Sequence, residues 1–208
     1  MTSRLPDGYF DRIYADSADP WQLSTRWYEQ RKYAITMALL PFRRYRHAFE
    51  PGCSIGTLTA RLADRCDHVT AVDVANAALR HCDDRLRQHG CRERVTLAKS
   101  SLDDPWPVGP FDLVVLSEVA YYLEADALAA AMRRECPRLA PGATVVTAHW
   151  RHEVGDYPLS GDVATDVITA TPGLIPLGGY RDRDVVIAVF DTGTGVSVAS
   201  REGVPGSQ

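Results

Sequence analysis

Apolar runs alternate with amphipathic stretches along the chain, and this alternation gives the first indication of the fold. The continuous apolar run at 111–117 is typical of a central parallel strand that is covered on both faces. Further strands are predicted to end at Glu50 and to span 69–73, 94–98, 144–148, 174–177 and 185–190, with helices at 57–64, 75–89, 125–139 and 162–170. This order predicts an α/β fold with a seven-stranded, mostly parallel sheet and helices on both faces.

The turn after the first predicted strand is the most informative stretch. Residues 48–56 read Ala-Phe-Glu-Pro-Gly-Cys-Ser-Ile-Gly, and a helical pattern follows. Glycines at 52 and 56 let the backbone approach a ligand closely, and the N–H groups at the helix start face that ligand. The second predicted strand ends at Asp73, from which a carboxylate accepts hydrogen bonds from ribose hydroxyls. Together these features predict a nucleoside-containing cofactor.

The composition of this turn discriminates between nucleoside cofactors. The dinucleotide fingerprint G-x-G-x-x-G would place glycines at 52, 54 and 57, but positions 54 and 57 are Ser and Thr. Glu50 would repel a diphosphate and suits a cationic ligand, so an NAD-dependent oxidoreductase remains only an alternative. The segment resembles motif I of the class I S-adenosylmethionine (SAM) methyltransferases, with Ser54 in place of the central glycine. The resemblance implies their Rossmann-like fold, SAM as cofactor and S-adenosylhomocysteine (SAH) as its product.

Ligands of open α/β sheets bind beyond the carboxyl ends of the strands, so residues that follow each strand are candidates for the site. The resemblance to methyltransferases implies cofactor contacts from Glu50, Gly52, Cys53, Gly56, Asp73, Val74, Ser101, Leu102 and Ser117. Ser101 and Leu102 would contact the adenine, at a place where many methyltransferases carry an acidic residue.

Three further residues at strand ends are candidates for catalysis. Glu118 is the main candidate for orienting a nucleophile, unless it caps the next helix or contacts only the cofactor. His149 can accept a proton near neutral pH, or it is a hydrogen-bonded structural histidine. Tyr122 forms a wall of the pocket or belongs to the core. An amine acceptor must arrive deprotonated, so Glu118 or His149 would take or relay its proton. The two histidines at 149 and 152 lack a converging carboxylate or thiolate, so we expect no metal site there.

The N-terminal segment carries a second signature, Asp-Pro-Trp at 19–21 followed by Tyr-Glu-Gln-Arg-Lys-Tyr at 28–33. Ser24 or Thr25 would cap a helix that runs to Pro41. Arg31 on this helix is predicted to bind the methionyl carboxylate of SAM, and Trp21 to shield it from water. A purely structural amphipathic helix is the alternative. We therefore predict a helical lid at 1–45, a SAM-binding core at 46–191 and a flexible tail at 192–208.

Five segments together resemble the NodS-like methyltransferases, small class I enzymes related to the nodulation-factor N-methyltransferases. They are 19–21, 28–33, 52–56, 117–123 and 149–151, and the resemblance spans roughly 9–191. It implies N-methylation of an amine such as a deacetylated amino sugar. Relatives often carry a histidine in the helix after the Gly-Asp pair, which the sequence Val-Ala-Thr-Asp at 163–166 lacks. O-methylation of a small metabolite, or SAM binding without catalysis, therefore stay open.

Composition and charge bound the remaining possibilities. The chain has 208 residues, of which 45% are hydrophobic, and a formal net charge of −4. This predicts one domain of sizeable core without a basic surface for nucleic acid. Apolar stretches stay well short of the roughly 20 residues of a membrane span, and the first residues lack the apolar core of a signal peptide. Five scattered cysteines without C-x-x-C spacing are typical of reduced thiols. We expect a cytoplasmic monomer or homodimer that acts on a small molecule, away from membranes.

Overall fold

A seven-stranded sheet lies at the centre of the protein in a computed structural model that describes residues 4–207. Its strands are β1 (Tyr45–Pro51), β2 (Cys66–Asp73), β3 (Val95–Lys99), β4 (Leu113–Ser117), β5 (Thr144–Trp150), β6 (Ile175–Arg181) and β7 (Val185–Asp191). Their order is β3-β2-β1-β4-β5-β7-β6. Strands β1 to β5 pair in parallel, whereas β7 is antiparallel to both β5 and β6. The predicted seven-stranded, mostly parallel sheet is confirmed.

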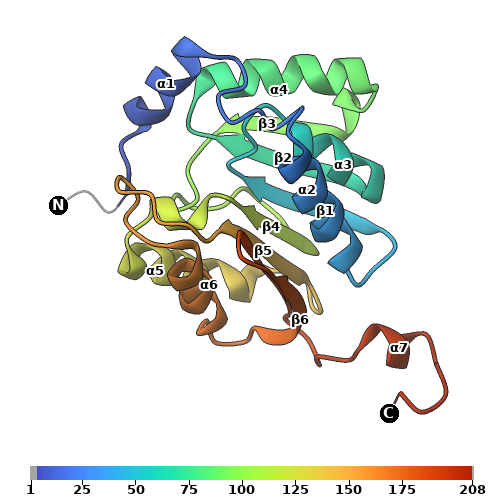
Figure 1. The fold of residues 1–208 in the computed structure, drawn as a ribbon. Coiled ribbons are helices and arrows are strands. Elements are labelled where there is room, and N and C mark those ends of the chain that lie inside the picture. The colour runs from blue at the N-terminus through green and yellow to red at the C-terminus, as the bar shows by residue number, and fades with distance from the viewer. Residues whose placement is uncertain (1–3, 208) are drawn as a thin grey trace.

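Helices cover both faces of the sheet (Figure 1). They are α1 (Asp7–Asp16), α2 (Trp27–Leu39), α3 (Thr57–Arg65), α4 (Asn76–His89), α5 (Ala125–Glu135), α6 (Gly161–Thr169) and the short α7 (Val198–Arg201). Helices α2, α3 and α4 lie on one face, and α5 and α6 on the other. Successive strand residues therefore enter different cores: Ala48 belongs to the α3 side and Phe49 to the α5 side, both without exposed surface.

One predicted helix end agrees with the structure and another differs for an identifiable reason. Helix α4 ends at Gly90 as its sequence indicates, with this glycine in the left-handed region at φ +73°. The helix predicted at 125–139 stops at Glu135 and continues as a 3₁₀ turn that contains Pro137, since proline has no N–H for the α-helical ladder.

The start of α2 also differs from the prediction. Neither Ser24 nor Thr25 caps it: Asp19 instead accepts the N–H groups of Leu23 at 2.7 Å and Ser24 at 3.0 Å, which holds a turn before the helix. Helix α1 carries no strong sequence pattern and was not predicted.

The sheet has a topological switch point between β1 and β4. The chain proceeds from β1 outward to β2 and β3, and from β4 outward in the other direction to β5. The two connections leave the carboxyl ends of β1 and β4 in opposite directions, which opens a crevice there.

A glycine at the start of α3 generates a stability prediction. Gly56 has φ +77°, and an added Cβ would lie 2.7 Å from Cys82 Sγ. Gly90 has a similar φ of +73° but open space around it. We expect Gly56→Ala to reduce the free energy of unfolding by about 2–4 kcal/mol, since strain and overpacking add, and Gly90→Ala by about 1–2 kcal/mol. Urea unfolding of both variants checks this, and equal losses would contradict the packing argument.

Candidate active site

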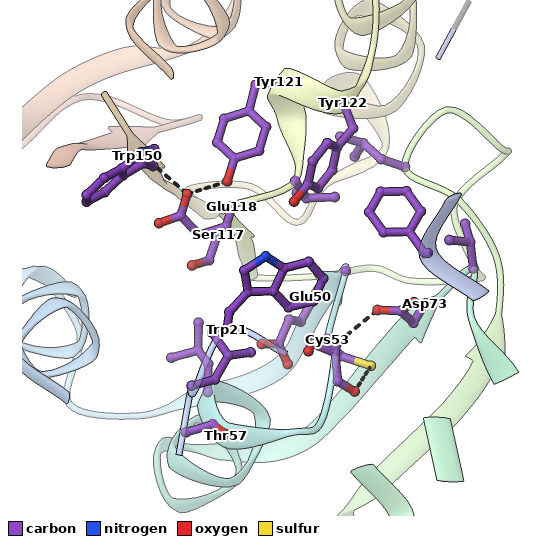
Figure 2. Close-up of a pocket in the computed structure, with 18 of the residues that line it drawn as sticks. Trp21, Glu50, Cys53, Thr57, Asp73, Ser117, Glu118, Tyr121, Tyr122 and Trp150 are labelled. Carbon is purple, nitrogen blue, oxygen red and sulfur yellow. Dashed lines mark hydrogen bonds between the residues drawn. The ribbon is translucent and has the colours of Figure 1, made fainter. Parts of the chain in front are cut away.

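A cavity of about 590 Å³ lies at the crevice, between the carboxyl ends of the strands and the N-terminal segment. Figure 2 shows Glu118, Tyr121 and Trp150 on one side of it and Glu50, Cys53 and Asp73 on the other. The predicted residues that line it are Trp21, Glu50, Gly52, Cys53, Asp73, Val74, Ser101, Leu102, Ser117, Glu118 and Tyr122. These segments are far apart in the sequence, and the parallel sheet brings them together.

Glu50 is a buried carboxylate in the cavity wall. It is 3% exposed, and its Oε2 atom has no hydrogen-bond partner among residues 4–207. Burial raises the pKa of Glu50 to about 8. Because an isolated buried charge is costly, the carboxylate gains most from a cationic ligand beside it.

The turn after β1 is held open by backbone geometry. Gly52 has φ +73°, and an added Cβ would lie 2.9 Å from Val119 Cγ2. The N–H groups of Gly52 and Cys53 donate to Val72 O at 2.8 and 3.0 Å, which fixes the turn against β2. Gly56, by contrast, packs on Cys82 and is not part of the cavity lining.

Asp73 closes the nucleoside side of the cavity at the end of β2. Its carboxylate accepts the N–H groups of Ser54 and Ala75, each at 2.9 Å. Burial raises the pKa of Asp73, whereas these backbone donors favour its ionised form. Each carboxylate oxygen retains a further lone pair for a ligand hydroxyl. Tyr14 of α1 contacts the same turn through a hydrogen bond between its hydroxyl and that of Ser54.

Ser101 and Leu102 line the cavity beyond β3. The hydroxyl of Ser101 donates a hydrogen bond to Asp103 Oδ1, and the backbone N–H of Ser101 donates to Asp104 Oδ2 at 2.8 Å. The acidic residues that follow Ser-Leu in the sequence therefore shape this loop.

Glu118 follows β4 in a left-handed conformation with φ +54°, which is unusual for a residue with a side chain. Its Oε1 accepts from Lys32 Nζ at 2.6 Å, and its Oε2 accepts from Tyr121 Oη at 2.6 Å and from the Trp150 N–H at 2.8 Å. Burial works against ionisation, but these donors outweigh it and hold the pKa of Glu118 below its ordinary value. An ionised carboxylate with three donors is a weak base. The geometry thus supports a role in holding the wall rather than in taking a proton.

Aromatic side chains form the rest of this wall. The Tyr122 ring packs edge-on against Phe10 at 4.9 Å and against Tyr157 at 4.8 Å. Tyr28 packs edge-on against Trp150 at 5.1 Å. The cavity on this side therefore suits a ligand with both apolar and polar faces.

Besides Gly56, two predicted site residues lie outside the cavity lining. His149 has no exposed surface, its Nδ1 is 3.0 Å from Thr165 Oγ1, and burial lowers its pKa to about 4. This is the structural alternative for that histidine. Arg31 forms an ion pair with Asp182 at 2.9 Å, so it does not face the cofactor turn.

Ser160 and Asp162 have separate roles at the start of α6. Ser160 accepts the Val163 N–H and so caps the helix, whereas Asp162 pairs with Arg151 at 3.0 Å.

The sequence reasoning missed several lining residues of the N-terminal segment. Glu29 and Lys32 line the cavity and stand 2.8 Å apart. Their i, i+3 spacing on a predicted helix indicates that the two side chains share a face. The cofactor contact predicted from the sequence is instead the neighbouring Arg31. Phe10 and Tyr14 come from the unpredicted α1, and Arg26 lies immediately before α2.

Two kinds of feature are absent from residues 4–207, the part of the chain that the structure describes. No group of three or more His, Cys, Asp or Glu side chains is arranged to hold a metal ion in this part of the chain. No helix within it has both the length and the apolar character needed to cross a membrane.

The switch-point crevice, the acidic glycine turn and the carboxylate at the end of β2 are arranged as in the class I methyltransferase fold. More narrowly, the chain belongs to the NodS family: the family model described as Nodulation protein S (NodS) matches residues 11–161.

Nodulation protein S of three organisms is similar to this chain. The protein of Bradyrhizobium diazoefficiens is 34% identical over 140 residues. The match covers 65% of this chain and 65% of that relative, which is just under two thirds of its length. The Rhizobium tropici protein is 30% identical over 182 residues, covering 83% of this chain and 75% of its own. The Sinorhizobium fredii protein is 29% identical over 186 residues, covering 85% of this chain and 84% of its own.

Solved structures share the fold. The N-methyltransferase NodS of Bradyrhizobium japonicum WM9 in complex with SAH has a TM-score of 0.77 at 23% identity, over 88% of this chain and 96% of that one. The 1,6-didemethyltoxoflavin-N1-methyltransferase of Burkholderia thailandensis has a TM-score of 0.71 at 16% identity, over 90% and 87%. Identities this low establish the common fold alone.

The raised pKa of Glu50 predicts how stability depends on pH. The folded protein keeps a proton on Glu50 up to about pH 8, whereas the unfolded chain releases it near the ordinary value of 4.5. Between these values the folded state binds more protons, so the free energy of unfolding falls as pH rises. From pH 6.5 to pH 8, we expect Glu50 to account for a loss of about 1–2 kcal/mol.

Urea unfolding of the cofactor-free protein and of Glu50→Gln at these two pH values measures this contribution. The variant should show a correspondingly flatter pH dependence. Parallel curves for the two proteins would contradict a protonated Glu50.

Proposed function

We propose that this protein transfers the methyl group of SAM to the amine of a small-molecule acceptor. The observation that carries the proposal is the buried carboxylate of Glu50, whose Oε2 has no hydrogen-bond partner among residues 4–207 and which lines the same cavity as Asp73. A ligand that bears both an ammonium group and a ribose complements this pair. SAM, when bound, supplies an electrophilic methyl group on a sulfonium centre. Family membership supports the amine, since a NodS protein of the same fold is named an N-methyltransferase.

The residues present fit SAM at each of its functional groups. Glu50 would accept hydrogen bonds from the ammonium, and Asp73 from the ribose hydroxyls. Ser101 and Leu102 would contact the adenine beyond β3, and the open turn at Gly52 and Cys53 would lie against the rest of the nucleoside.

The carboxylate of SAM requires a different partner from the one that the sequence indicated. Arg31 is occupied by Asp182, whereas Arg26 lines the cavity at the N-cap of α2 and forms no salt bridge within the described part of the chain. No side chain caps this helix start. Unpaired helix N–H groups and a guanidinium favour an anion, so Arg26 is our choice for the carboxylate.

The N-terminal segment would act as a lid in this scheme. Several side chains of this segment, among them Phe10, Trp21 and Arg26, line the cavity opposite the strand ends. The acceptor would lie on the side of Glu118, Tyr122 and Trp150, whose aromatic rings suit the face of a sugar. A deacetylated amino sugar is therefore the acceptor that we propose to test first.

The proposal as a whole is tested by calorimetric titration with SAM and SAH, followed by transfer of labelled methyl from SAM to a panel of amines and matching alcohols. We expect both cofactor forms to bind and the label to appear on an amine. Asp73→Ala should weaken SAM binding by about 1–3 kcal/mol through lost charge-assisted hydrogen bonds. Asp112→Ala is the matched control, because Asp112 also accepts two backbone N–H groups but lies outside the cavity lining. Unchanged SAM affinity in Asp73→Ala, or label on alcohols alone, would contradict the proposal.

The two arginines give a second test. Arg26→Gln should weaken SAH binding by about 1.5–3 kcal/mol, the range for a hydrogen bond to a charged group. Arg31→Gln should leave SAH binding nearly unchanged, since its surface ion pair with Asp182 lies elsewhere. Calorimetry on both variants measures this. A larger loss in Arg31→Gln would return the carboxylate to the site that the sequence indicated.

A further inference from the structure

An ion triad, with Glu29 and Lys32 buried and Glu118 partly exposed, lies in the wall of the cavity. Lys32 is 1% exposed, and its Nζ lies 2.8 Å from Glu29 Oε2 and 2.6 Å from Glu118 Oε1. All three residues line the cavity. Two carboxylates share one ammonium, so the triad carries one net negative charge when all members are ionised.

The surroundings keep that charge in place. The second oxygen of Glu118 accepts from Tyr121 and from the Trp150 backbone, and Lys32 lies 5.3 Å from the Tyr28 ring and 5.4 Å from the Tyr33 ring. Among the described residues, no other Lys, Arg or His forms a salt bridge with Glu29 or Glu118. Burial lowers the pKa of Lys32, but the two carboxylates reverse this and raise it, so the ammonium persists.

The triad lies on the acceptor side of the cavity. Glu118 follows β4 and contacts the end of β5, whereas the nucleoside residues follow β1, β2 and β3. Figure 2 shows Glu118 and Trp150 across the cavity from Glu50 and Asp73. A ligand that spans the cavity therefore ends near the triad.

We propose that the Glu29–Lys32–Glu118 triad is a fixed negative charge that stabilises positive charge at the acceptor end, and that it thereby selects an amine over a hydroxyl as methyl acceptor. The inference rests on the proposed function. The acceptor nitrogen gives its lone pair to the methyl carbon, the carbon–sulfur bond breaks with its electron pair on sulfur, and a proton then leaves the nitrogen to water. Positive charge thus moves from sulfur to nitrogen, toward the triad.

A hydroxyl acceptor has the opposite requirement. It must lose its proton as the new bond forms, so it needs a base at the acceptor end. Glu118 is held by three donors, and His149 is outside the cavity lining. A negative charge that takes up no proton hinders formation of an alkoxide and helps formation of an ammonium.

The comparison of SAM with SAH tests the charge without any acceptor. The two differ at sulfur by the methyl group and one positive charge, so the ratio of their Kd values reports the electrostatics of that end of the cavity. Glu29→Gln and Glu118→Gln each remove the net charge, and we expect each to weaken SAM relative to SAH by about three- to tenfold. The double variant Lys32→Met with Glu118→Gln leaves Glu29 as the one charge, and its ratio should return toward that of the wild type.

Controls separate charge from structure. Asp67→Asn removes an exposed carboxylate at the amino end of β2, outside the cavity lining, and should leave the ratio unchanged. If the triad is merely structural, the variants should weaken the binding of SAM and of SAH equally, and the double variant should weaken both the most. That result would overturn the proposal. If neither SAM nor SAH binds the wild-type protein, the proposed function itself fails.

The acceptor half of the proposal is tested on the SAH-bound protein. Glucosamine in its protonated form carries a charge where the methylated nitrogen would carry one, and glucose replaces that amine by a hydroxyl. We expect glucosamine to increase the affinity for SAH at least threefold more than glucose does, and Glu29→Gln to remove the difference. Equal effects of the two sugars, including no effect of either, would overturn the selection of an amine.

Discussion

Three carboxylates at one edge of the sheet, two of them buried and the third partly exposed, set the constraint on which the rest of the site depends. Glu50, Asp73 and Glu118 lie at the carboxyl ends of the neighbouring strands β1, β2 and β4. Asp73 has two backbone donors, Glu118 has an ammonium, a phenol and a backbone N–H, and Glu50 has no partner on Oε2. Their different surroundings give them different chemistry, because buried charge needs compensation: Glu50 suits a cation, Asp73 suits hydroxyls, and Glu118 stays ionised.

The N-terminal segment does more than cover the cavity, because it supplies a positive charge that compensates these carboxylates. It supplies Lys32, without which Glu118 and Glu29 would be uncompensated carboxylates in the cavity wall. A backbone bridge between Arg4 and Leu123, with the Leu5 N–H donating to Tyr122 O at 3.0 Å, ties the same segment to the loop after β4.

Much of the architecture was predictable from sequence, because strand and helix periodicities and the glycine turn are local signals. The parallel sheet, the turn at Gly52 and the placement of Asp73 in the cavity follow from them. Which face of an element meets the cavity is a property of packing. His149 and Trp150 are adjacent on β5, yet the pleat directs them to opposite faces, and α6 covers the histidine. Arg31 and Lys32 are separated by about 100° on α2 in the same way, and of these two cations Lys32 is the one that lines the cavity.

We infer that this acidic cavity holds SAM with its charges matched to named side chains. A crystal structure of the SAH complex tests this inference most directly. We expect the ammonium of SAH beside Glu50, the ribose hydroxyls on Asp73, the carboxylate at Arg26, and the sulfur directed toward Glu118. SAH bound in the reverse orientation, or with its carboxylate at Arg31, would contradict it.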